Sequence, residues 1–83
     1  MKAFLTNYKG HQIRVENGWV SGERLVIDGE TQDELLGFAL RSRLWGSIRN
    51  GSGAAEFIKV ELGGWSATEC RIFVNDKLVY PAS

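Results

Sequence analysis

Short segments in which apolar and polar residues alternate, separated by glycine-containing turns, constrain this chain more than any other feature. Between His11 and Glu16, Ile13 and Val15 fall on one side of an extended strand and polar residues fall on the other. The same alternation returns in residues 56–62 and 69–74. Ten glycines against one proline supply the positive-φ positions that tight turns need. The pattern therefore predicts short antiparallel strands joined by hairpins.

The predicted strands belong to one domain, residues 1–83. Turn residues stand at Asp28-Gly29 and Asn75-Asp76, a loop is centred on Tyr8-Lys9-Gly10, and Asn17-Gly18 indicates a further, longer connection. Strands are expected at residues 3–6, 11–16, 23–27, 36–41, 44–49, 56–62, 69–74 and 77–80. This arrangement favours an all-β fold, a small antiparallel β-sandwich of about seven or eight short strands. Lys77 and Pro81 would protect the last strand against edge-to-edge association.

Residues 32–45 fit two structures. Thr31 and Glu34 have the spacing of a helix capping box, which allows a helix over this segment. The alternation of apolar residues with Arg41 and Arg43 instead favours two strands, 36–41 and 44–49, joined near Ser42. The strands are the preferred interpretation, and the acidic residues just before them are expected in a solvated turn.

Charge and cysteine content narrow the class of protein. Ten basic and ten acidic side chains cancel, whereas nucleic-acid-binding domains usually carry a basic excess, so we expect no nucleic-acid partner. The single cysteine, Cys70, cannot form an internal disulfide, which is typical of proteins in a reducing cytoplasm. The sequence has no signal-peptide pattern and no stretch of about 18 apolar residues. We therefore expect cytoplasmic localisation and no membrane partner.

Two stretches resemble the Fas apoptotic inhibitory molecule family. The first runs from His11 through Ser21-Gly22-Glu23-Arg24 to Asp28-Gly29, and the second runs from Ile58 to Leu78. The resemblance implies a β-sandwich unit without catalytic machinery, with a role in protein interaction, survival signalling and resistance to aggregation. Members of that family contain two such units and this chain has room for one, so the resemblance concerns the fold first.

The sequence assembles no catalytic or metal site. His11 and Cys70 are its only histidine and cysteine, whereas a zinc site needs about four such ligands. Cys70 stands at an apolar strand position, which predicts a core residue. A nucleophilic pair would also need an orienting group and an oxyanion site. We therefore expect no enzyme activity, no metal and no cofactor, and a small enzyme ranks third among the functional hypotheses.

Three tryptophans and a group of arginines are the candidate binding residues. Each tryptophan stands beside a glycine, which predicts a turn tip, where an indole could either stack on a partner or fill an open end of the sandwich. Arg41 and Arg43 could receive an acidic peptide or a phosphate, or pair with Glu56 or Glu61 on a solvated sheet face. The candidate surface comprises Trp19, Trp45, Trp65, Arg41 and Arg43.

The first functional hypothesis is a non-enzymatic protein-interaction module that acts through an edge strand or through this Trp/Arg surface. Its partner would be another protein or a second copy of the chain. The alternative is a carbohydrate- or small-ligand-binding β-sandwich module, which requires the tryptophans to lie coplanar on one face.

Overall fold

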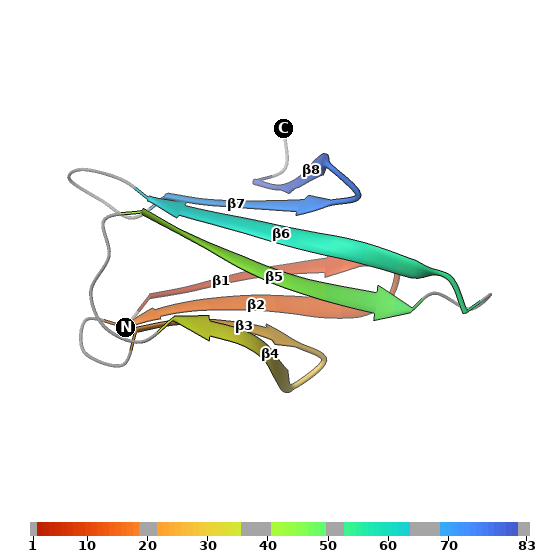
Figure 1. The fold of residues 1–83 in the computed structure, drawn as a ribbon, viewed down its shortest axis with the longest axis horizontal. Coiled ribbons are helices and arrows are strands. Elements are labelled where there is room, and N and C mark those ends of the chain that lie inside the picture. Colours follow the sequence, from red (N-terminus) through yellow and green to blue (C-terminus); the bar gives the residue numbers. More distant parts are fainter. Residues whose placement is uncertain (1, 19–21, 36–40, 50–52, 64–68, 82–83) are drawn as a thin grey trace.

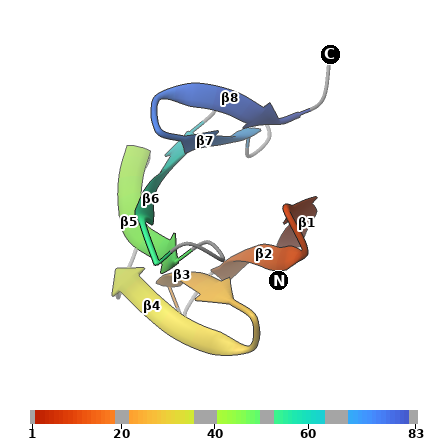
Figure 2. The same ribbon diagram turned by 90° about the vertical axis from the view of Figure 1, so that its right-hand side faces the viewer.

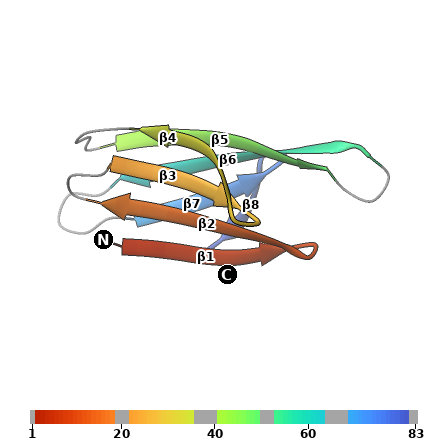
Figure 3. The same cartoon turned by 90° about the horizontal axis from the view of Figure 1, so that it is seen from below.

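The strands form two four-stranded antiparallel sheets (Figure 1). The computed structural model describes residues 2–18, 22–35, 41–49, 53–63 and 69–81. The first sheet contains β1 (Lys2–Tyr8), β2 (His11–Gly18), β3 (Gly22–Ile27) and β4 (Glu30–Leu35). The second contains β5 (Arg41–Arg49), β6 (Ala55–Gly63), β7 (Glu69–Val74) and β8 (Lys77–Tyr80). Each sheet is a meander with its strands in sequence order, and the sheets stack face to face (Figure 3). The all-β antiparallel sandwich expected from the sequence is confirmed.

Two-residue turns join three of the strand pairs. Both turn residues have positive φ: 48° and 82° at Lys9-Gly10, 51° and 84° at Asp28-Gly29, and 49° and 66° at Asn75-Asp76. Positive φ at both positions is the type I′ turn, whose twist matches that of the flanking strands. Glycine, asparagine and aspartate tolerate this conformation best, which is why Asp28-Gly29 and Asn75-Asp76 indicate their turns in the sequence.

The core lies between the two sheets and takes alternate residues from the strands. The fully buried set confirms the faces predicted from the alternation in β2, β6 and β7. Its largest members are Ile13, Val15, Leu25, Leu44, Ile58, Val60, Ile72 and Val74. Cys70 belongs to this core as predicted, and burial raises the pKa of its thiol to about 12.

The middle of the chain differs from the sequence-based expectation. Residues 30–35 form strand β4 where a solvated turn, or the start of a helix, was expected. Ser42 is not a turn, because it lies inside β5 and pairs with Leu62 of β6. The described part of residues 32–45 is extended throughout, so the helix interpretation is wrong there. Of the predicted strand 36–41, residues 36–40 lie outside the described residues, and Arg41 begins β5.

The sequence of strand β4 has no apolar alternation, because its side chains make hydrogen bonds to a neighbouring strand instead of filling the core. Gln32 Nε2 donates to the carbonyl of Ser47 at 2.9 Å, and the N–H of Ser47 donates to Gln32 Oε1 at 2.8 Å. The N–H of Trp45 donates to Asp33 Oδ2 at 2.8 Å. These bonds occupy backbone groups that an edge strand would otherwise present to another chain. The two sheets are therefore joined along β4 and β5 (Figure 2).

The opposite side of the sandwich is joined differently. There β1 faces β8, and the end-on view shows the sheets further apart than at β4 and β5 (Figure 2). The rings of Phe4 and Tyr80 meet edge to face across this side, with their centroids 6.1 Å apart. An aromatic contact thus takes the place that hydrogen bonds have along β5.

The two sheets are structural repeats of one four-stranded unit. Strand β2 reads Ile13-Arg14-Val15-Glu16-Asn17-Gly18 and strand β6 reads Ile58-Lys59-Val60-Glu61-Leu62-Gly63, which agree in every position but the second and the fifth. Both units have a β-bulge in their last hairpin, between Leu25 and Val26 in the first and between Ile72 and Phe73 in the second. Each half of the chain therefore folds into the same meander.

The last turn of each unit is clamped to the second strand of that unit. The N–H of Asp28 donates to the carbonyl of Gln12, and the N–H of Gln12 donates to Asp28 Oδ1 at 2.8 Å. Asn75 makes the same pair of bonds with Phe57, at 2.8 Å and 2.9 Å. An aspartate or asparagine at the first turn position thus extends the pairing of the sheet by one residue.

The clamp at Asp28 is expected to make the stability of the fold depend on pH. Its carboxylate lies 2.6 Å from His11 Nδ1, and the hydrogen bonds from His11 and from the Gln12 N–H lower the pKa of Asp28 below its ordinary 3.8. A carboxyl with a lowered folded-state pKa stabilises the fold above its unfolded pKa, and this contribution is lost as pH falls through the folded pKa. Asp28→Asn keeps a turn-forming residue and an acceptor for Gln12. We expect its urea midpoint to lie below that of the wild type near neutral pH and to converge with it below about pH 4. Parallel pH profiles of the two proteins would contradict this.

Candidate functional site

An apolar row crosses the outer face of the β5–β8 sheet. Trp45 of β5 lies opposite Lys59 of β6, Lys59 lies opposite Phe73 of β7, and Phe73 lies opposite Leu78 of β8. Phe57 stands on the same face, two residues before Lys59. We call these five residues, Trp45, Phe57, Lys59, Phe73 and Leu78, the aromatic row.

Three of the four apolar side chains of the aromatic row are exposed to solvent, and the fourth, Phe73, is half-buried. Trp45 is 58% exposed, Phe57 is 66% exposed and Leu78 is 51% exposed. The Lys59 ammonium lies 4.7 Å from the centroid of the Phe73 ring, which is a cation–π contact. The described residues contain two other exposed large apolar side chains, Leu5 and Leu35, both in the first sheet. Exposed apolar side chains are therefore concentrated on one face of the second sheet.

Arginine and lysine surround the aromatic row. Arg43 pairs with Glu61 at 3.6 Å, as expected from the sequence. Among the described side chains, the charged residues that face outward from this sheet are Arg43, Arg49, Lys59, Arg71, Glu61 and Glu69. Four basic against two acidic residues give this face a positive charge, although the whole chain is neutral. The side chain of Arg41 lies outside the described residues, so its predicted place in the surface stays a prediction.

Glu56, the other predicted acidic partner of the arginines, is on the wrong face for that role. It is buried between the sheets, where Oε1 accepts a hydrogen bond from the Tyr8 hydroxyl at 2.9 Å and lies 3.3 Å from Lys9 Nζ. Its Oε2 has no partner among the described residues. The hydrogen bond and the charge of Glu56 raise the pKa of Lys9 above its ordinary value. Glu56 therefore ties the first hairpin of one sheet to the other sheet.

The tryptophan prediction is corrected in part. Trp45 is not at a turn tip but in the middle of β5, and its glycine neighbour, Gly46, faces the core. Trp19 and Trp65 lie outside the described residues, so their predicted positions are untested. Reading β5 as one strand, with Leu44 and Ile48 inward, would have placed Trp45 on the outer face. Phe57, Phe73 and Leu78 were not singled out, because only the register brings them together with Trp45.

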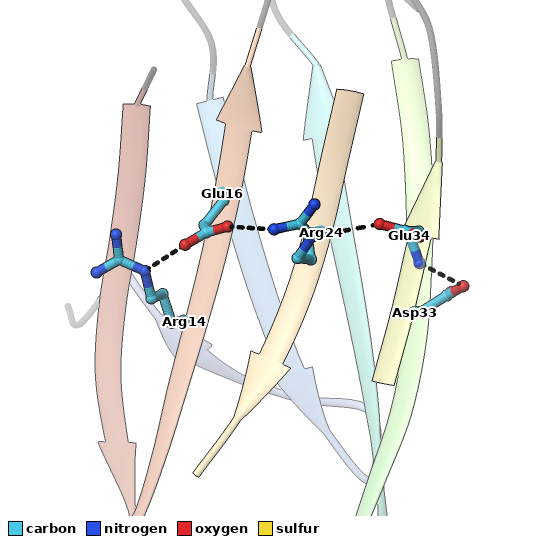
Figure 4. A network of polar contacts seen from close by, with 5 residues as sticks. All are labelled: Arg14, Glu16, Arg24, Asp33 and Glu34. Atoms are coloured by element: carbon cyan, nitrogen blue, oxygen red, sulfur yellow. Dashed lines mark hydrogen bonds and ion pairs between the residues drawn. The ribbon is translucent and has the colours of Figure 1, made fainter. Parts of the chain in front are cut away.

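The outer face of the first sheet has the opposite character. Arg14 Nε donates to Glu16 Oε2 at 2.8 Å, and Glu16 Oε1 lies 3.5 Å from Arg24 Nη1. Arg24 in turn lies 3.3 Å from Glu34 (Figure 4). This chain of alternating charges satisfies its own members and leaves a hydrated surface. Such exposed ion pairs contribute little stability, about 0–1 kcal/mol each.

No family model, curated protein or solved structure matches the chain. The resemblance to the Fas apoptotic inhibitory molecule family therefore stays a prediction.

Neither a metal-binding cluster nor a helix that could span a membrane is found in the part of the chain that the structure describes. Among the described residues, no three of His, Cys, Asp and Glu gather as metal ligands would. Within the same residues there is no helix that is long and apolar enough to cross a bilayer. His11 bonds to Asp28, and Cys70 is buried in the core of the other sheet.

Proposed function

We propose that this chain is a protein-interaction module that binds its partner through the aromatic row. The observation that carries the proposal is the register of β5 to β8, which lines up Trp45, Phe73 and Leu78 on one solvent-facing surface. Tryptophan is the residue most enriched among the energetic centres of protein interfaces, and contiguous exposed apolar patches often mark binding sites. The resemblance noted in the sequence also implies an interaction role.

The partner fits this face with side chains and not by adding a strand to β5. The N–H of Trp45 is already bonded to Asp33, and both the N–H and the C=O of Ser47 are bonded to Gln32. A partner that covers the row would place apolar side chains against Trp45 and Leu78. The basic excess around the row favours acidic residues at the rim of the partner. We therefore assign the site an acidic segment of another protein that carries apolar anchors.

A displayed library of random peptides provides a defined probe for this proposal. Selection on the wild-type protein is expected to enrich peptides that combine acidic with aromatic or aliphatic residues. The Trp45→Ala change should weaken their binding by at least about 2 kcal/mol, or about 30-fold in Kd, because it removes the central anchor. Titration calorimetry on synthetic copies of the selected peptides measures this loss.

The matched control is Leu35→Ala, which also truncates an exposed apolar side chain, but on the other sheet. Its peptide affinity should equal that of the wild type. Failure to enrich any peptide, or equal affinities for Trp45→Ala and the wild type, would contradict the proposal. A glycan array screened in parallel tests the alternative, and glycan binding that Trp45→Ala abolishes would favour a carbohydrate-binding module.

A further inference from the structure

The repeat makes β1 of the first sheet the counterpart of β5 of the second. Leu5 pairs with Arg14 and Trp45 pairs with Lys59, and Arg14 and Lys59 are equivalent in the repeated motif. Leu5 is therefore the counterpart of Trp45. By the same registers Asn7 is the counterpart of Ser47, since their partners Gln12 and Phe57 are the two residues clamped by the turns.

Strand β8 lacks the polar side chains by which its counterpart, β4, bonds to a neighbouring edge strand. In the first unit the bulge leaves Gln32 without a ladder partner, and Asp33 pairs with Leu25. In the second unit the residues at these places are Val79 and Tyr80. Gln32 and Asp33 bond to the free edge of β5, but a valine side chain has no hydrogen-bonding group, and the Tyr80 ring packs against Phe4. Among the described residues, nothing bonds to the free edge of β1 as these two side chains bond to β5.

The first hairpin fixes which backbone groups of β1 are free. In a two-residue type I′ hairpin, Tyr8 and His11 form the hydrogen-bonded pair next to the turn. Pairs alternate along an antiparallel ladder, so the even-numbered residues of β1 bond to β2. The N–H and C=O groups of Ala3, Leu5 and Asn7 therefore point away from the sheet.

The other edge strands carry protection that β1 lacks. Strand β8 has four residues and is followed by Pro81, β4 is bulged and acidic, and β5 is bonded to β4. Strand β1 pairs regularly with β2 over its seven residues, and Lys2 at its start is its one charged residue. A long, regular and nearly uncharged edge is the kind that natural sheets protect unless it pairs with another strand.

We infer that β1 is a self-association edge, on which a second copy of the chain pairs antiparallel about a two-fold axis at Leu5. In this register Leu5 faces Leu5 of the second copy, Ala3 faces Asn7, Phe4 faces Thr6 and Lys2 faces Tyr8. Each copy contributes three N–H and three C=O groups, from Ala3, Leu5 and Asn7, so all outward groups of both copies are used. A two-fold axis at Phe4 or at Thr6 would shift the register and leave some of these N–H and C=O groups without a partner in the other β1 strand.

The side chains are compatible with this pairing. Leu5, 49% exposed in the single chain, buries against its own copy. No two charged residues of the β1 strands face each other, because Lys2 faces Tyr8, whose ring has the Lys9 ammonium of the turn 5.4 Å from its centroid. A single strand pair is a small interface, so the dimer should be reversible and depend on concentration. This inference uses β1 and does not depend on the aromatic row.

The two-fold axis gives a specific test, because one substitution at position 5 meets itself in the dimer. Sedimentation equilibrium of the wild type is expected to show a monomer–dimer equilibrium. Leu5→Lys and Leu5→Glu, each measured alone, should raise the dimer Kd at least about tenfold, since like charges then face each other across the axis. An equimolar mixture of the two variants should associate again, because opposite charges meet. Association of the mixture would show that each variant alone fails to dimerise because like charges meet at position 5, and not because the variant is unfolded.

Thr31→Lys is the control, since Thr31 lies in the same cross-strand row of that face but on β4. It should leave the dimer Kd unchanged, and so should Trp45→Ala if the aromatic row binds a different partner. Amide exchange adds a second readout, in which Leu5 and Asn7 are protected at high concentration only. A wild type that stays monomeric, dimers that persist in both Leu5 variants, or a mixture that does not associate would each overturn the inference. Peptide-dependent protection of β1 in a monomeric protein would instead indicate a foreign strand.

Discussion

The Ile58→Ala variant is expected to lose about 2–5 kcal/mol of unfolding free energy, the usual range for truncating a buried isoleucine. Ile58 is completely buried in the middle of β6, so the change removes apolar contacts and leaves a cavity. A domain of this length has about 4–12 kcal/mol in total, at about 0.05–0.15 kcal/mol per residue. The single change therefore removes a large part of the stability, and urea unfolding should show a lower midpoint with an unchanged slope.

Phe57→Ala is the matched control because Phe57 is the neighbouring residue and is larger, yet it faces solvent. Its unfolding free energy should stay within about 0.5 kcal/mol of the wild type. The repeat adds a second expectation, since Ile13 is the counterpart of Ile58 and is equally buried. Ile13→Ala should lower the same single transition by a similar amount. Two separate transitions, or an Ile58→Ala midpoint equal to that of Phe57→Ala, would show that the sheets do not share one core.

Gly46→Val is expected to lower the unfolding free energy by about 1–3 kcal/mol, the usual cost of overpacking a core. A Cβ at this position would lie 2.8 Å from Gln32 Oε1 and 2.9 Å from Leu25 Cδ2, both closer than real Cβ contacts. Valine favours strands, so a loss of stability would come from these contacts and not from the strand conformation. Because Gln32 must move, the Ser47 amide should also exchange faster with solvent.

Ser47→Ala controls for this change, since Ser47 is the next residue and its side chain faces outward while its backbone makes the bonds to Gln32. Thermal unfolding of Ser47→Ala should match that of the wild type. A Gly46→Val protein as stable as the wild type, with an unchanged Ser47 amide, would show that the close approach of β4 and β5 is not required.

The elements that the sequence predicted are those in which local pattern and burial agree. Ile13 and Val15 alternate with polar residues because one face of β2 is core and the other is solvent. The turns at Asp28-Gly29 and Asn75-Asp76 are visible because few residues tolerate two consecutive positive φ values. In these segments the backbone conformation and the pattern of burial favour the same residue types.

The elements that the sequence did not predict are those in which a residue hydrogen-bonds to, or packs closely against, a neighbouring strand. Gln32 and Asp33 are polar because they bond to the backbone of β5, so β4 has no apolar alternation to detect. Gly46 resembles a turn glycine but is small because Gln32 and Leu25 pack against it. The predictions of a turn at β4 and at Gly46 are wrong for the same reason. In each case the deciding contact involves residues that only the tertiary fold brings together.

The candidate site was predicted only as far as the local pattern allows. Trp45 and Arg43 were named, and both lie on the outer face of the second sheet. Phe73 joins them through two successive registers and Leu78 through a third, which depends on the bulge between Ile72 and Phe73. Neither the registers nor the bulge have a local signal in the sequence, so the complete row becomes visible only in the structure.

The most direct measurement of the central claim is an amide and indole correlation spectrum of the labelled protein, titrated with a peptide selected for acidic and apolar residues. Binding at the aromatic row predicts that the Trp45 indole signal and the amide signals of Lys59 and Phe73 shift together and saturate at one peptide concentration. The amides of Arg14 and Arg24, on the outer face of the other sheet, should not move. Shifts confined to the first sheet, with an unmoved Trp45 indole, would contradict the claim.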